Sequence, residues 1–141
     1  MFVNGDAAVK PQNLQVAKGS VLRTASGVFY SGMTLHDAKM IGRDKCFLRR
    51  DFKKLDKNCD NVLTNDEIML ERDREVKRFN GDGIFIGLFA LDEYVRLFKS
   101  SGGKIFNIIF AGIFTLGSIN AFSKAKKLKE SNEYIRKNFN V

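Results

Sequence analysis

Oxygen-bearing side chains are concentrated in one short segment, residues 56–67, with the sequence DKNCDNVLTNDE. A calcium ion takes about six to eight oxygen ligands, and a loop of about 12 residues can supply them from alternate positions and a closing acid. The candidate ligands here are Asp56, Asn58, Asp60, the backbone carbonyl of Val62, Thr64 acting through water, and Glu67 as a bidentate acid. The segment therefore predicts one Ca²⁺ site.

The ligand spacing, together with the apolar Leu63 at the eighth position, resembles the loop of the EF-hand family. The resemblance covers residues 47 to about 70 and implies a helix on each side of the loop. Asn61 stands at the sixth position, where glycine is expected because the backbone turns there with positive φ. Asparagine tolerates this conformation better than other non-glycine residues. Dockerins share the Asp, Asn, Asp spacing, but they carry two such loops.

The predicted site is weak, because it has three acidic ligands and no competent second loop. We expect a Kd of about 10⁻⁵ to 10⁻³ M. EF-hand loops normally pair, and the sequence NGDG at residues 80–83 invites comparison with a second loop. In either register, basic or apolar side chains fall at its ligand positions. We therefore expect a degenerate structural partner or a plain Asn-Gly turn.

A simpler interpretation makes residues 56–67 a capped turn without an ion. Thr64 and Glu67 have the spacing of a capping box for a helix that begins next to them. Asp56 and Asp60 would then be ordinary turn residues. This interpretation explains the end of the segment but not the regular spacing of its first half.

Three helices are expected around this loop. Thr34 is a weak N-cap, with an acid in the first turn, for a helix through Ile41 that Gly42 interrupts. A second helix is expected over residues 45–55 and a third over residues 65–79. The apolar face of the second consists of Phe47, Leu48, Phe52 and Leu55.

Weaker signals describe the remainder of the chain. Residues 1–33 are expected to form an extended arm, in which VLRTASGVFY either makes a short hairpin or wraps the domain. Residues 84–98 are apolar, with a break at Gly87, and SSGGK at residues 100–104 is a flexible connector.

An uncharged apolar run of 18 residues, 105–122, lies between Lys104 and Lys124. Its length is at the lower limit for a membrane span and equally fits a buried core helix, so both interpretations stay open. Six cations follow the run, and basic segments tend to stay on the cytoplasmic side of a membrane. With a single span, the N-terminal part of the chain would therefore have to cross the membrane. Residues 1–9 show no secretory signal, so the protein is not expected to be classically secreted.

The last helix is expected to be long and to continue from this run into the basic tail. Small or apolar residues recur along it at spacings of three and four. Such a seam favours close approach to a neighbouring helix, and it is compatible with oligomers. Its members are Ala111, Phe114, Ser118, Ala121, Ala125, Leu128, Asn132, Ile135 and Phe139.

Composition excludes several classes of protein. With 141 residues, 44% of them hydrophobic, the chain can bury a core, and its length suits one compact domain. Two cysteines without paired spacing support neither a disulfide framework nor a zinc site. We expect Cys46 in the core, and Cys59 and His36 at the surface. No nucleophile–base pair or phosphate-binding loop is recognisable, so catalytic residues are not expected.

The net charge of +8 has two concentrations that could meet phosphate, either in lipid headgroups or in nucleic acid. Either could instead be a solvated helix face. The cations are Arg49, Arg50, Lys53 and Lys54 in the first patch, and Lys124, Lys126 and Lys127 in the second.

These observations predict a mainly α protein with an EF-hand-like helix-loop-helix and a helical hairpin that ends in a long apolar helix. The expected divisions are an arm (1–33), an EF-hand-like domain (34–99) and an apolar helix with a basic tail (100–141). The expected function is that of a non-enzymatic calcium-binding structural or accessory subunit. It would dock to a membrane or a larger assembly through residues 105–122. The alternative is a soluble basic subunit associated with nucleic acid or a ribonucleoprotein.

Overall fold

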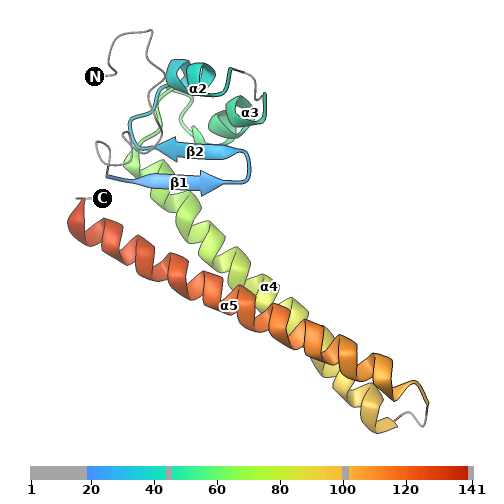
Figure 1. Ribbon diagram of the computed structural model, residues 1–141. Helices are drawn as coiled ribbons and strands as arrows, with labels where there is room; N and C mark the ends of the chain where they lie inside the picture. Colours follow the sequence, from blue (N-terminus) through green and yellow to red (C-terminus); the bar gives the residue numbers. More distant parts are fainter. Residues whose placement is uncertain (1–18, 44–45, 100–101, 140–141) are drawn as a thin grey trace. The chain divides into compact units, whose positions relative to one another are not determined.

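The computed structural model describes residues 19–43, 46–99 and 102–139. In these residues it is mainly helical, as the sequence predicts, with a small two-stranded sheet (Figure 1). The elements in chain order are β1 (Val21–Thr24), β2 (Gly27–Tyr30), α2 (Leu35–Ile41), α3 (Cys46–Leu55), α4 (Asn65–Lys99) and α5 (Lys104–Asn138).

The chain forms two compact units, of which the first is built from two separated segments and the second from one continuous segment. The first combines the described residues up to Arg72 with those from Asn132 onward, and the second is Asp73–Ser131. The divisions expected from the sequence, at 33/34 and 99/100, separate consecutive segments of the chain. The boundaries of the two units instead fall within α4 and within α5.

A β-hairpin begins the first unit. β1 and β2 pair antiparallel, with Val21 opposite Tyr30 and Thr24 opposite Gly27. Of the two expected alternatives the hairpin is therefore the one that forms, and residues 21–30 are not an extended arm. Leu22 and Phe29 are fully buried in the core. Residues 1–18 of the expected arm lie outside the described residues.

Helices α2 and α3 complete this core. Thr34 caps α2 through a capping box with Asp37, and Gly42 is the C-cap, as the sequence predicts. On α3, Leu48, Phe52 and Leu55 are buried. The ring of Phe52 lies 6.3 Å from that of Phe29, between ring centroids.

Two residues assigned to the core from the sequence are at the surface. Phe47 is 59% exposed, and Cys46 is exposed too, so both assignments were wrong. Each residue advances the helix by about 100°, which carries positions 46 and 47 off the face that holds Leu48 and Phe52. Cys59 and His36 are exposed, as expected.

Helix α4 is continuous through NGDG and Gly87, so both the expected turn at residues 80–83 and the break at Gly87 were wrong. The reason is packing against α5. A Cβ atom at Gly83 would lie 2.9 Å from the Phe122 ring, and one at Gly87 would lie 3.1 Å from the Ser118 hydroxyl. Glycine at these positions permits close helix contact, which outweighs a propensity cost of about 1 kcal/mol per residue.

In the second unit α4 and α5 form an antiparallel hairpin, because Gly83 lies opposite Phe122 and Gly87 opposite Ser118. The expected long last helix and its small-residue seam are observed. Ala111, Ala121 and Ala125 are the buried residues of α5 in this unit. Gly103 has a φ of 73°, so a left-handed turn precedes α5.

The continuation of the seam belongs to the first unit, where Asn132 and Ile135 are buried. The guanidinium of Arg72 donates from Nε to the Asn132 side-chain oxygen at 2.7 Å, and it also donates to the Val21 carbonyl. Arg72 is only 6% exposed, so these hydrogen bonds compensate the cost of burying its charge.

The core of the first unit supplies a test of these assignments. Phe52→Ala should lower the free energy of unfolding by about 3–5 kcal/mol, because it leaves a cavity beside Phe29. Phe47→Ala, on the same helix, should change it by less than about 0.5 kcal/mol. Urea unfolding followed by circular dichroism measures both, and equal effects would contradict the assigned faces of α3.

Candidate functional site

The six candidate ligands lie in the loop between the end of α3 at Leu55 and the start of α4 at Asn65. Asp56 and Glu67 are buried, at 6% and 9% exposure, whereas Asn58 and Asp60 are exposed. Leu63 is fully buried, as expected for the apolar eighth position. The loop therefore joins the core at both of its ends and is open to solvent in the middle.

Carboxylates organise the first half of the loop by accepting backbone hydrogen bonds. Asp56 accepts from the N–H groups of Asp60, at 3.2 Å, and Asn61, at 2.9 Å. Asp60 accepts from the Val62 N–H at 2.8 Å and from the Asn58 side-chain amide at 3.0 Å. Each oxygen of both carboxylates accepts one of these bonds and so retains a lone pair for a cation.

Glu67 closes the loop. Its Oε1 accepts from the N–H groups of Lys57, at 2.7 Å, and Asn58, at 3.4 Å, and its Oε2 accepts from that of Thr64 at 3.0 Å. The Thr64 hydroxyl in turn accepts from the Glu67 N–H at 3.3 Å. The expected capping box is therefore present, and the same carboxylate also connects the start of the loop to its end.

The backbone turns in this loop with positive φ at two non-glycine residues, Cys59 at 59° and Asn61 at 63°. The value at Asn61 is the left-handed conformation expected at the sixth position. Side chains with a Cβ adopt it at a cost of about 1–2 kcal/mol, and asparagine is among those that visit it most readily.

The donor set fits a hard cation in chemistry but is not assembled as a cage. Within residues 19–43, 46–99 and 102–139, no group of three or more His, Cys, Asp or Glu side chains could hold a metal ion. Oε1 of Glu67 already accepts two N–H groups, so bidentate ligation requires it to exchange at least one of them for the ion. Asp56 and Asp60 need no such exchange.

The loop is paired with a segment upstream, a contact the sequence analysis missed. Thr34 and Val62 form an isolated antiparallel bridge. The Leu63 N–H donates to the Met33 carbonyl, and the Leu35 N–H donates to the Asn61 carbonyl, each at 2.8 Å. Residues 80–83, considered as the partner from the sequence, lie inside α4 instead.

A repeat in the sequence carries the signal for this pairing. Met33-Thr34 is followed by Asp37, and Leu63-Thr64 is followed by Glu67, so the pattern apolar-Thr-x-x-acid occurs twice. Both copies end in a capping box, and Met33 and Leu63 are both fully buried. The upstream copy has no acidic ligands before Asp37, which explains why a search for oxygen ligands passes over it.

The basic residues of α3 face solvent. Arg49, Arg50, Lys53 and Lys54 are all exposed. The Arg50 guanidinium lies over the Phe47 ring, 5.4 Å from its centroid, and Lys54 is 3.9 Å from the Asp51 carboxylate. Lys124, Lys126 and Lys127 on α5 are also exposed.

The apolar run is not a core helix of this chain. Among the described helices, α5 is the one that is long and apolar enough to cross a membrane. Only 11% of its most apolar 18-residue stretch is buried. The exposed large apolar residues of the run are Ile105, Phe106, Ile108, Ile109, Phe110, Ile113, Leu116, Ile119 and Phe122. Those of the adjacent part of α4 are Ile84, Phe85, Leu88, Phe89, Leu91, Tyr94, Val95 and Phe98.

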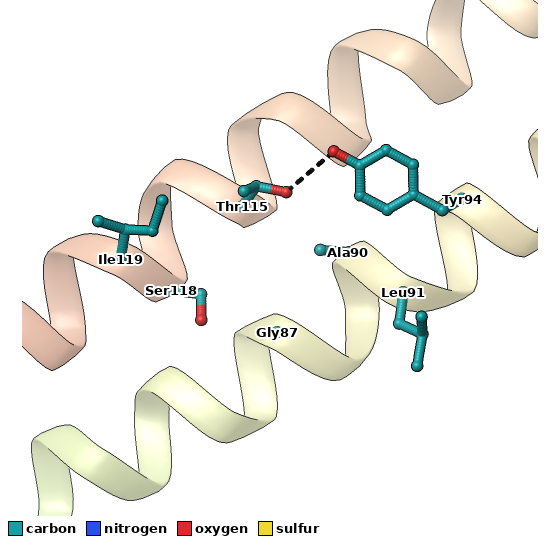
Figure 2. Close-up of a pocket in the computed structure, with 7 residues that line it drawn as sticks. All are labelled: Gly87, Ala90, Leu91, Tyr94, Thr115, Ser118 and Ile119. Atoms are coloured by element: carbon teal, nitrogen blue, oxygen red, sulfur yellow. Dashed lines mark hydrogen bonds between the residues drawn. The ribbon is translucent and has the colours of Figure 1, made fainter.

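A pocket of about 260 Å³ lies between these two helices (Figure 2). It forms where small side chains meet, because Gly87 and Ala90 of α4 lie opposite Ser118 of α5. The Tyr94 hydroxyl reaches across to the Thr115 hydroxyl at 3.3 Å. The Ser118 hydroxyl donates to the Gly83 carbonyl at 2.7 Å. The pocket is thus part of the helix contact.

Comparison with protein-family models, with curated proteins and with solved structures gave no match. The function proposed below therefore rests on the residues of this chain.

The positive φ of Asn61 can be tested by substitution. Asn61→Val should lower the free energy of unfolding by about 1–2 kcal/mol, because a β-branched side chain is strained in this conformation. Asn61→Gly should change it by less than about 0.5 kcal/mol, since less strain is offset by a freer unfolded chain. Lys57→Val is the control in the same loop. Urea unfolding that ranks the two valine variants equally would be evidence against the assigned turn.

Proposed function

We propose that this protein is a non-enzymatic, calcium-binding structural or accessory subunit that docks to a membrane or a larger protein assembly through residues 105–122. The observation that carries the proposal is the exposure of large apolar side chains along α5 and the adjoining part of α4. Contiguous apolar patches larger than about 300–600 Å² are rare on soluble monomers and mark interaction surfaces.

The calcium part of the proposal is supported by the donor set of residues 56–67 and by the position of the loop. Asp56 follows α3 and Glu67 lies in the first turn of α4, so an ion bound there would link the two helices. An ion that binds the folded loop alone adds about 2.7 kcal/mol to stability at 100 times its Kd. The ion would therefore act as a local staple.

The alternative, a soluble subunit that binds nucleic acid, is supported by the exposed cations of α3. It requires the apolar helices to be covered within the chain itself, and their exposure favours docking instead. Binding to nucleic acid that weakens steeply with salt, from a chain that is monodisperse without detergent, would favour the alternative.

Glu67→Gln tests the ion site. Without calcium it should lower stability by about 1–3 kcal/mol, because an amide nitrogen cannot accept the N–H bonds that one of the two oxygens accepts now. It should also abolish the rise in melting temperature that calcium produces in the wild type. Asp66→Asn, which removes a neighbouring charge, is the matched control and should retain that rise. Thermal melts with calcium and with magnesium measure this, and equal stabilisation of all three proteins by calcium would refute the site.

Paired lysine substitutions test the docking surface. Ile113→Lys with Leu116→Lys should reduce self-association and detergent dependence of the full chain, because both residues are exposed and apolar. Glu130→Gln with Glu133→Gln raises the net charge by the same amount at the same spacing, on exposed residues of α5 outside 105–122, and should leave association unchanged. Light scattering after detergent removal measures both. A wild type that stays monomeric without detergent and without any partner would contradict the docking role.

A further inference from the structure

We propose that the second unit inserts into a lipid bilayer with anionic headgroups as an antiparallel helical hairpin, so that the segments before Asp73 and after Ser131 leave it on the same side. This inference rests on the proposed docking function. It names the lipid bilayer as the partner and fixes the topology of the chain in it.

The apolar surface of α5 faces in too many directions for a protein groove. Ile108, Ile109 and Phe110 are consecutive, so they point about 100° apart around the helix, yet they are 58%, 51% and 46% exposed. A groove or a second helix covers one face of such a helix, whereas hydrocarbon surrounds it. A helix that is apolar all round is typical of a protein core or a membrane, and this one is not in the core of its chain.

The contact between the helices is of the kind that membranes favour. In hydrocarbon, helices associate through small residues and hydrogen bonds, because burying apolar side chains between them gains little. Here Gly83 and Gly87 meet Phe122 and Ser118, and Gly117 meets Ile86, so a small residue faces a larger one at each point, while most of the large apolar residues are exposed. Phe89 and Phe114 also meet across the two helices, with 5.7 Å between ring centroids. The hydroxyls of Ser118 and Thr115 donate to the carbonyls of Gly83 and Ala111, each at 2.7 Å, so neither needs water.

The lengths of the two apolar segments match each other and a bilayer. Residues 105–122 rise by about 27 Å and residues 83–98 by about 24 Å, against a hydrocarbon core of about 30 Å. Lys99 and Lys104 flank the connection between the helices. These two cations would mark the far surface of the bilayer.

Positive charge gathers at the opposite end of the hairpin. Because Gly83 lies opposite Phe122, the antiparallel register brings Arg78 near the level of Lys127. The exposed cations of this end are Arg74, Lys77, Arg78, Lys124, Lys126, Lys127 and Lys129, and they outnumber its exposed acids, Asp82 and Glu130. Each cation is worth about 1 kcal/mol of attraction to an anionic membrane surface. This complementarity identifies the occupant as an anionic leaflet.

Two of the three charged residues in residues 83–98 of α4 are paired with each other. Asp92 accepts from the Arg96 guanidinium at 2.9 Å, which offsets the charge of each. With these charges, and Glu93 beside them, α4 is not apolar enough to span alone. It enters as the second half of a hairpin whose other half, α5, supplies the hydrophobic length.

The hairpin also removes the orientation conflict of a single span. One span through residues 105–122 would separate the basic tail from the rest of the chain. In a hairpin, the cations before residue 83 and those after residue 122 stay on one side, as the preference of basic segments for the cytoplasmic side requires.

The test counts thiol tags on each molecule of the full chain in vesicles of phosphatidylcholine with phosphatidylglycerol. The variant combines Cys46→Ser with Glu130→Cys and has two thiols. Cys59 is exposed and precedes the hairpin in the sequence, and the thiol introduced at position 130 follows the apolar part of α5. A membrane-impermeant maleimide should add either two tags or none to a molecule, whichever way it is inserted, and two to all molecules after detergent. The protein should resist extraction by high salt and alkaline carbonate. Vesicles without phosphatidylglycerol should bind less of it.

The outcomes separate the hairpin from the docking function. One tag per molecule would show a single span and overturn the hairpin while leaving docking through α5 intact. Self-association without vesicle binding, or complete extraction by salt, would overturn insertion in favour of a protein or peripheral contact. A protein that is a monodisperse monomer and does not bind vesicles would overturn both proposals. The variant with Ile113→Lys and Leu116→Lys, in the same cysteine background, should fail to float with vesicles in a density gradient. That result would show that insertion depends on the apolar face of α5.

Discussion

Close packing of α4 against α5 through small residues is the constraint on which the second unit depends. Glycine at residues 83 and 87 leaves room for Phe122 and Ser118, so the two helices approach closely, and most of their large apolar side chains are exposed. A hairpin that folds in water has the opposite arrangement, with large apolar residues between its helices and polar ones outside. The distribution of side-chain size across this contact is what connects the fold to the proposed membrane role.

The first unit is held by a different kind of contact. Two short segments, around Met33 and Leu63, pair through backbone hydrogen bonds, and each leads directly into a capped helix. The core of β1, β2, α2 and α3 lies around this junction. The candidate ion loop, residues 56–67, contains the segment around Leu63. The conformation of the loop is therefore supported by protein contacts at both of its ends.

Local chemistry could be predicted from the sequence, and tertiary contacts could not. The caps at Thr34 and Thr64 and the seam of α5 depend on neighbours within a few residues, and the structure contains them. The turn at residues 80–83 was predicted from the same local rules and does not form, because the fit of Gly83 against Phe122 is set by a residue far away in the chain. For the candidate site, the capping box of Thr64 and Glu67 could be predicted from spacing, but the hydrogen bonds from the Lys57 and Asn58 N–H groups to Glu67, across the length of the loop, could not.

The hydrogen bonds of Glu67 order the loop without an ion. Its carboxylate already connects Lys57 to Thr64, so the ordering of the loop does not wait for a cation. Small metal-dependent domains lose their fold to a chelator because only the ion holds their ligands together. If the proposed ion binds here, its removal by a chelator would lower the stability of the loop modestly and leave its backbone conformation in place, so the loop would be a local staple and not a switch.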